Sequence, residues 1–320
     1  MNPSRSMAQH VDAYLGLRRA FGFHLTIAGL LLRDFAGFAD RVAPGKPLTT
    51  TVALSWAQSS ITGKQVSAAR RLVILRPFTR YLRTIDPATE VLPQRILGPA
   101  QYRHIPHIYT EKEIRSLLDA TASLRPRKGL RALSVQTYIG LMACTGLRPQ
   151  EPLRLTRADV DLPSHSLIVR ETKFSKSRRV MLHATGVDAL RRYAQIRDRR
   201  VPFSQSAAFF LCDDGTALPL KKARWAFNYL RRQLGWAGQA GLQPRLYDLR
   251  HTFVCRRLLA WYRDGVDVQV ALPALSTYLG HVKVTDTYWY VTAIPELMST
   301  VSTRFERFVR SAVEGQRDFD

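Results

Sequence analysis

The sequence predicts a mainly helical protein of two domains, the second of which holds a small antiparallel β-sheet. Apolar residues recur at helical spacing through most of the first hundred residues. Between residues 92 and 109, three prolines interrupt any regular period. Beyond them, residues 159–183 contain the short apolar runs that are typical of strands.

The first domain is predicted to consist of helices over residues 7–23, 26–42, 50–60 and 67–85. The second of these ends before Pro44 and Gly45, which are typical of a helix stop. We therefore expect a helical N-terminal domain at residues 1–92, a linker at residues 93–109 and a second domain at residues 110–320.

The second domain is predicted to begin at a capping box, because Thr110 and Glu113 have the Thr-x-x-Glu spacing. Further helices are predicted over residues 129–146, 221–236, 248–265 and 271–280, and the first of these ends at Gly146. Two apolar runs, residues 167–169 and 180–182, flank a polar loop and predict an antiparallel ribbon. Residues 207–216 fit a further short strand and turn.

The charge balance points to a polyanionic partner. The chain has 48 Lys and Arg against 25 Asp and Glu, a net charge of +23 that is spread along its length. Nucleic acid is the leading candidate, and an anionic membrane is second.

No apolar run approaches the ~20 residues of a spanning helix, and the N-terminus lacks a signal-peptide pattern. Three dispersed cysteines favour neither disulfides nor zinc. We expect a soluble, cytoplasmic protein without a membrane partner.

Four segments of the second domain hold side chains with possible chemical roles. In chain order these are Arg148 and Glu151, Lys173 and Lys176, Tyr247 with Arg250 and His251, and His281 with Tyr290. Taken singly, these side chains can also have ordinary structural roles. An arginine in so basic a chain is usually solvated, a histidine after glycine is more often a cap, and a helical tyrosine is more often half buried.

Order and context favour a specific function. T-G-L-R-P-Q-E at residues 145–151, a lysine on a β-turn, L-R-H-T-F at 249–253 and L-G-H at 279–281 followed by Tyr290 resemble the tyrosine recombinases, the family of phage integrases and Xer enzymes. The resemblance covers about residues 110–300, and the N-terminal domain resembles the family's core-binding domain in layout. It implies a DNA recombinase that forms a 3′-phosphotyrosyl link without metal, ATP or other cofactor. It also implies a double-stranded DNA recombination site and a homotetramer on two duplexes.

The resemblance assigns the phosphate clamp to Arg148 and Arg250. A guanidinium suits this task because it pairs with two phosphate oxygens and stays charged. A lysine at the ribbon tip would protonate the leaving 5′ oxygen. The pattern favours Lys173, which leaves Lys176 as a phosphate contact, but the register of a hairpin is hard to predict from sequence.

Tyr290 matches the family's nucleophile. Two positions apart on one helix, Tyr288 and Tyr290 point about 200° apart, so both cannot face one phosphate. His281 would hydrogen-bond the phosphate or the incoming phenol. For Glu151 two interpretations stay open, support of the site through a neighbouring side chain or a surface carboxylate that neutralises a nearby arginine.

Tyr247 departs from the family pattern, which usually has histidine there. A phenol can donate a hydrogen bond to a phosphate oxygen, but it is a poorer acid–base group near neutral pH. We expect Tyr247 to replace the hydrogen bond and the chemistry to survive. A DNA-binding regulator with an impaired site and a type IB topoisomerase are the alternatives. His251 points about 100° from Arg250 on the same helix, so we expect it to pack beneath the site.

The tail at residues 294–315 is amphipathic, with Leu297, Val301, Phe305 and Phe308 at helical spacing. It would pack on its own domain or dock on a neighbouring protomer, and the sequence favours neither. The expected biological setting is a mobile element, such as a transposon or phage.

Overall fold

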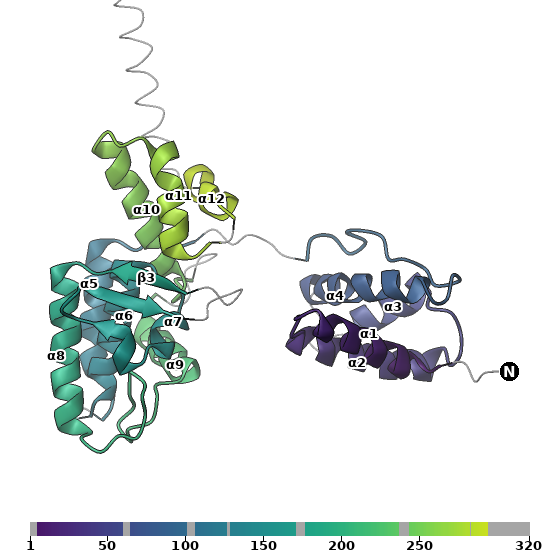
Figure 1. The fold of residues 1–320 in the computed structure, drawn as a ribbon, viewed down its shortest axis with the longest axis horizontal. Helices are drawn as coiled ribbons and strands as arrows, with labels where there is room; N and C mark the ends of the chain where they lie inside the picture. Colours follow the sequence, from purple (N-terminus) through teal and green to yellow (C-terminus); the bar gives the residue numbers. More distant parts are fainter. Residues whose placement is uncertain are drawn as a thin grey trace, which may run out of the picture. The chain divides into compact units, whose positions relative to one another are not determined.

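The computed structural model describes residues 5–59, 65–100, 106–126, 129–170, 177–236, 243–281 and 283–293, with backbone alone at residues 289 and 291–293. The chain divides into two compact units, Met1–His104 (unit 1) and Ile105–Asp320 (unit 2). The described residues are mostly helical and include a three-stranded antiparallel sheet in unit 2 (Figure 1). The predicted fold class is therefore confirmed.

Unit 1 is built from the predicted helices, which are α1 (Met7–Ala20), α2 (Thr26–Val42), α3 (Thr50–Gln58) and α4 (Gln65–Arg83). The start of α1 is stabilised by a capping box between Ser6 and Gln9. The core of unit 1 contains an aromatic cluster, in which Phe35 contacts Trp56 and Phe78 edge to face at centroid distances of 5.1 and 6.4 Å. The regularly spaced apolar residues that predicted these helices form the face that each helix buries in the core of unit 1.

Both ends of the predicted linker, residues 93–109, belong to one unit or the other. Arg76 donates to the carbonyl oxygens of residues 92 and 93, and Arg70 donates to that of residue 100, which ties this segment to α4. At the other end Tyr109 is 1% exposed, and its main-chain N–H donates to Thr252 at 2.9 Å. The boundary between the units falls at residues 104 and 105.

Unit 2 holds most of the helices. They are α5 (Glu111–Ala120), α6 (Arg131–Thr145), α7 (Glu151–Arg154), α8 (Ala184–Arg200), α9 (Leu220–Gln233), α10 (Asp248–Arg263), α11 (Val268–Leu279) and α12 (Thr285–Ala293), with 3-10 turns at Thr121–Ser123 and Arg157–Asp159. The predicted capping box opens α5, since Thr110 accepts from the Glu113 N–H at 3.1 Å and Glu113 accepts from the Thr110 N–H at 2.7 Å.

The helix α8 was not predicted from the sequence. Its buried positions are Val187, Leu190, Tyr193 and Arg197, which do follow helical spacing. The pattern was hard to recognise because one of the four buried residues is an arginine and the rest of the helix is strongly polar. In residues 207–216, where a short strand and turn were expected, the backbone forms isolated bridges with Thr156 and Ala217.

The sheet has strand order β1 (Val160–Asp161), β2 (Ser166–Val169) and β3 (Arg178–Met181). The predicted ribbon is the β2–β3 pair, in register Leu167 to Val180 and Val169 to Arg178. The additional strand β1 extends it. Leu167, Val169 and Val180 point into the core of unit 2.

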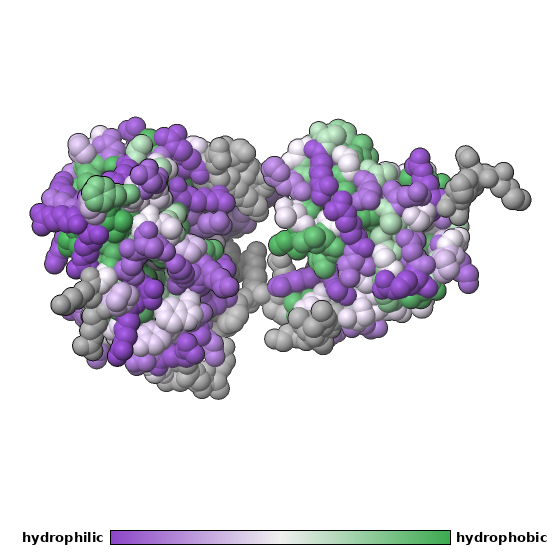
Figure 2. Space-filling model, turned by 90° about the horizontal axis from the view of Figure 1, so that it is seen from below, coloured by the Kyte–Doolittle hydropathy of each residue, from purple (hydrophilic) through white to green (hydrophobic). Residues whose placement is uncertain are grey.

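The helices α10, α11 and α12 lie together on one side of unit 2 (Figure 1). They share a small core that includes Val254, Leu258, Leu272 and Tyr290. On the face drawn in Figure 2, hydrophilic residues cover much of both units, as the net charge of +23 leads one to expect.

Candidate active site

The turn after α6 carries Arg148 into the interior of unit 2. The helix ends at Gly146, whose φ of +64° is left-handed, and a Cβ there would lie 2.5 Å from Phe253. Glycine is therefore required by both conformation and space. Beyond it, the Arg148 main-chain N–H donates to Glu151 at 2.8 Å, and its Nη1 donates to the same carboxylate at 3.0 Å.

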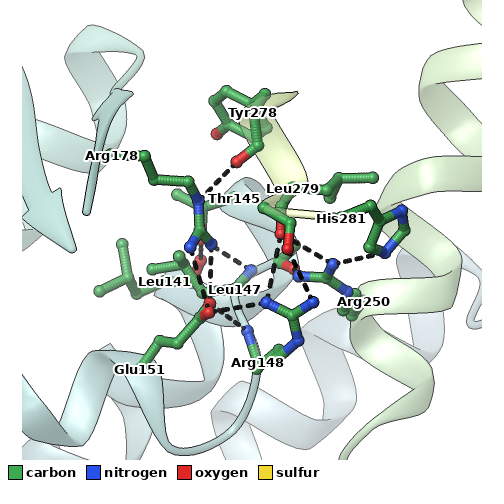
Figure 3. Close-up of polar contacts among 12 residues, drawn as sticks. Leu141, Thr145, Leu147, Arg148, Glu151, Arg178, Arg250, Tyr278, Leu279 and His281 are labelled. Carbon is green, nitrogen blue, oxygen red and sulfur yellow. Dashed lines mark hydrogen bonds and ion pairs between the residues drawn. The ribbon is translucent and has the colours of Figure 1, made fainter. Parts of the chain in front are cut away.

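Arg250 lies on the first turn of α10 and is fully buried. Its Nη1 donates to the Gly146 carbonyl at 2.8 Å, and its Nη2 donates to the Leu279 carbonyl at 2.9 Å. Arg148 donates to the same Leu279 oxygen at 3.4 Å and to the Gly280 oxygen at 3.0 Å. The two arginines therefore meet at the C-terminal end of α11 (Figure 3).

A third arginine completes this arrangement. Arg178, the first residue of β3, donates from Nε to the Tyr278 carbonyl at 2.7 Å. The last carbonyl groups of a helix have no partner within it and carry the negative end of the helix dipole. At α11 they are satisfied by three guanidinium groups, and this accounts for the close approach of three like charges.

Glu151 is buried, so the surface interpretation of this carboxylate is wrong. It is 7% exposed and accepts from the Arg178 Nη1 and Nη2 at 3.1 and 2.8 Å, in addition to Arg148. Burial alone would raise the pKa of Glu151, but the hydrogen bonds and charge of Arg178 and the Arg148 N–H hold it below its usual value. The carboxylate is therefore ionised near neutral pH.

His281 follows Gly280, which ends α11 with φ +67°. Its Nε2 lies 2.8 Å from Arg250 Nη2, and its Nδ1 lies 2.7 Å from the Thr287 hydroxyl. Because an arginine only donates, Nε2 accepts and the proton of the neutral ring is on Nδ1. Burial, with Arg250 and Arg148, lowers the pKa of His281 to about 4. The imidazole is therefore neutral at pH 7.

The local charge favours an anion. Arg148, Arg178 and Arg250 contribute three positive charges, Glu151 contributes one negative charge and His281 is neutral. The cluster thus carries a net charge of +2 in a largely buried setting. Such a charge, held by fixed donors, matches a phosphodiester and the further charge that develops on it during transfer.

The two tyrosines of α12 point in different directions, as their helical spacing predicts. Tyr288 is 47% exposed, whereas Tyr290 is 3% exposed and packs in the core of α10–α12. Burial raises the pKa of the Tyr290 phenol, and the charge of Arg250 and its hydrogen bond to the phenol oppose this rise. Tyr290 therefore lies next to Arg250 as a protonated phenol.

Tyr247 and His251 extend this group toward the surface. Tyr247 precedes α10 and is 39% exposed, with its ring centroid 5.1 Å from that of His251. The His251 ring lies 5.3 Å from the Tyr290 ring, and burial lowers the pKa of His251 to about 4. The His251 ring therefore lies between the two phenols, and Tyr247 occupies an exposed edge of this group.

Some residues to which the sequence analysis assigns a role lie outside the part of the chain that the structure describes. Lys173, Lys176 and the amphipathic tail at residues 294–315 lie outside the described residues. In the part of the chain that the structure describes, no three His, Cys, Asp or Glu side chains form a group able to hold a metal ion. Within the same residues, no helix is both long and apolar enough to span a membrane.

Sequence reasoning missed two residues of the site, Arg178 and Thr287. Thr287 is fully buried and lies three positions before Tyr290, so its side chain is on the same face of α12. That spacing was a usable signal. Arg178 had no such signal, because it is one of two adjacent arginines in a very basic segment.

Residues 108–296 match the phage integrase family. Two integrase/recombinase proteins of Sinorhizobium fredii, y4rE and y4rB, are each 38% identical to the chain. Their alignments cover 94% and 93% of this chain and 96% of each relative. The tyrosine recombinase XerD of Mycobacterium tuberculosis is 29% identical over 80% of this chain and 76% of its own length.

Solved structures share the fold. The integrase of transposon Tn1549, in complex with circular intermediate DNA, has a TM-score of 0.66 at 17% identity and covers 95% of this chain and 100% of that one. A lambda integrase dimer bound to a core site has a TM-score of 0.60 at 17% identity, covering 88% of this chain and 97% of that one.

Proposed function

Since this chain belongs to the phage integrase family and is a tyrosine recombinase, we propose that it breaks and rejoins DNA through a 3′-phosphotyrosyl intermediate formed on Tyr290. One observation carries the proposal. Arg250 contacts the Tyr290 phenol and shares the Leu279 carbonyl with Arg148, so a phenol and two guanidinium groups converge on one small region.

The proposed first step is an in-line displacement at phosphorus. The Tyr290 oxygen bonds to phosphorus, the bond to the 5′ oxygen breaks, and that oxygen leaves with a proton. Arg148 and Arg250 stabilise the charge on the non-bridging oxygens. Lys173, in preference to Lys176, is the proposed donor of the leaving-group proton. Tyr247 is the proposed further hydrogen-bond donor to the phosphate.

The phenol must lose its own proton as it attacks, because burial keeps Tyr290 protonated at neutral pH. We assign this role to His281. As Arg250 Nη2 turns from the His281 Nε2 to the phosphate, the Nε2 lone pair is freed and takes the phenol proton, while Thr287 holds the proton on Nδ1. In the second step a 5′-hydroxyl of another strand attacks the phosphotyrosine and Tyr290 leaves. The phosphodiester is re-formed without ATP because the covalent intermediate conserves the bond.

The proposed partner is a double-stranded DNA recombination site, bound by both units. The net charge of +23 supports extensive phosphate contact, and such binding weakens steeply as salt rises. Four protomers on two duplexes are the proposed working assembly. The proposed setting is a mobile element, because the relatives at 38% identity are named integrase/recombinase, whereas the XerD relative is 29% identical.

A covalent adduct tests the mechanism. Duplexes that the protein binds are selected from a random library, and the selected site is then nicked at successive positions so that religation is prevented. We expect a protein–DNA adduct resistant to denaturation with the wild type and with Tyr288→Phe, and none with Tyr290→Phe. An adduct that persists in Tyr290→Phe would contradict the assignment of the nucleophile.

The same preparation separates the alternatives. A regulator with an impaired site would bind the selected duplex and form no adduct at any nick position. A topoisomerase would relax arbitrary supercoiled plasmid without producing a recombinant junction. The recombinase proposed here requires such a junction, detected by sequencing across two copies of the selected site, and requires it to be absent in Tyr290→Phe.

A further inference from the structure

We propose that Arg178 is a positioning residue of the recombination site, which holds Glu151 and the C-terminal end of α11 so that Arg148 and His281 are aimed at the phosphate. The inference rests on the proposed function, and it concerns a residue for which the sequence offered no signal. Within the described residues, the hydrogen bonds of Arg178 go to Glu151 and the Tyr278 carbonyl and not to a proposed reacting group, so its role is exerted through its neighbours.

The first connection runs through the carboxylate. Arg178 grips both oxygens of Glu151 in a bidentate pair at 2.8 and 3.1 Å, with side chains 10% and 8% exposed. The same two oxygens accept from the main-chain N–H and Nη1 of Arg148. Because the carboxylate cannot rotate without breaking the Arg178 fork, the direction in which Arg148 extends is set from β3 (Figure 3).

The second connection runs through the end of α11. The Nε of Arg178 donates to the Tyr278 carbonyl, three residues before His281. A Cβ on Gly280 would lie 2.8 Å from Arg178 Nη1 and 3.1 Å from its Cζ. The Arg178 guanidinium therefore lies directly against the turn that presents His281, and the glycine leaves room for it.

The position of Arg178 in the chain allows it to link three segments that are far apart in sequence. It is the first residue of β3 and follows directly after residues 171–177, the segment that contains Lys173 and Lys176. One side chain thus connects the strand next to that segment with the Arg148 turn and the His281 turn, which lie 30 and 103 residues away in sequence. A lysine would keep the charge, but it lacks the planar fork that reaches both Glu151 oxygens and the Tyr278 carbonyl together.

The test compares Arg178→Lys with Arg179→Lys, a matched control at the next position, whose side chain is exposed. Adduct formation is measured in single turnover on the nicked selected duplex, at saturating DNA, together with the dissociation constant and the thermal midpoint. We expect Arg178→Lys to slow adduct formation by about 10²-fold, with DNA affinity within about 3-fold of wild type. Arg179→Lys should keep the wild-type rate.

A double-mutant cycle shows whether Arg178 acts through the carboxylate. If it does, Glu151→Gln combined with Arg178→Lys is no slower than the slower single variant. Multiplying effects would show independent action and overturn the first connection. A rate for Arg178→Lys within about 3-fold of wild type would overturn the inference, while the Tyr290-dependent adduct of the wild type would leave the proposed function standing.

If the wild type forms no adduct, the proposed function fails, and the inference is decided on the free protein. The pKa of His281 is measured by NMR titration of its ring. Because lysine keeps the charge, a rise in Arg178→Lys from about 4 toward the ordinary histidine value reports a displaced turn. An unchanged pKa of His281 in that variant would overturn the inference.

Discussion

In the part of unit 2 that the structure describes, buried arginines lie in two places, and only one of these places gathers several largely buried guanidinium groups around one carboxylate. Arg197 on α8 is 2% exposed, and its Nε and Nη2 donate to Asp198 at 2.8 and 3.1 Å. Asp198 also pairs with Arg157, whose side chain is exposed, at 3.0 Å. Its Nη1 donates to the Phe209 carbonyl, and its guanidinium lies over the Phe209 ring. The side chain is saturated by a counter-ion, a carbonyl and an aromatic face.

At the end of α11 Arg148 and Arg178 share Glu151, whereas Arg250 donates to the Gly146 and Leu279 carbonyl groups. Carbonyl dipoles orient a guanidinium but do not cancel its charge. The comparison indicates that a single buried arginine beside a carboxylate serves the fold, whereas several largely buried arginines around one carboxylate leave a positive charge that suits an anion.

The largest difference between the two places is expected when the guanidinium of Arg250 is replaced. Arg250→Lys keeps the positive charge but cannot reach Gly146, Leu279 and His281 together. We expect single-turnover adduct formation to fall by about 10³-fold, because a fixed donor to the developing charge is lost. Arg257→Lys, at an exposed position on the same helix, is the control and should keep its rate. Equal rates for the two variants would refute the clamp role of Arg250.

Substitution of Arg197 should have the opposite effect, a loss of stability without a loss of rate. Arg197→Met should lower the free energy of unfolding by about 3 kcal/mol, because the buried Phe209 carbonyl loses its donor and Asp198 loses one of its two arginine partners. Urea unfolding measures this, and Arg199→Met, at an exposed position of α8, should change stability by less than about 0.5 kcal/mol. At a temperature where both proteins are folded, the adduct rate should stay within about 2-fold of wild type. A large loss of rate per folded molecule would remove the distinction between the two places.

A smaller effect concerns the proton balance of the site. The folded pKa values of His281 and His251 are about 4, below the ordinary value, so both rings are neutral when folded and take up protons on unfolding between about pH 4 and 6.5. Their contribution to stability is therefore complete above about pH 6.5 and is lost as the pH falls toward 4.

His281→Asn should remove about one of these protons. Near pH 5.2 the unfolding free energy of the variant should then depend on pH less steeply by about 1.4 kcal/mol per pH unit. His251→Asn should do the same. Urea unfolding at a series of pH values measures the slope. An unaltered slope in His281→Asn would mean that this ring is not held neutral by its neighbours.

Much of the fold was accessible from the sequence because its signals are local. The period of apolar residues in α1 to α4 reflects one face of each helix, and the predicted capping box at Thr110 involves residues three apart. The same locality explains the failure at α8, where a buried arginine takes a position that the pattern assigns to an apolar residue. It also explains the separation of Tyr288 from Tyr290, which depends only on helix geometry.

The sequence by itself determined which residues are available to the site, because Arg148, Arg250, His281 and Tyr290 stand in motifs whose order and spacing can be read along the chain. Only the tertiary structure decided that Glu151 is buried, that Arg178 holds it, and that Arg250 sets the His281 tautomer. The physical reason is range. Helix periods and caps depend on neighbours within a turn or two, whereas hydrogen bonds between residues 27 to 132 positions apart exist only once the packing of α6, β3, α10 and α11 has brought them together.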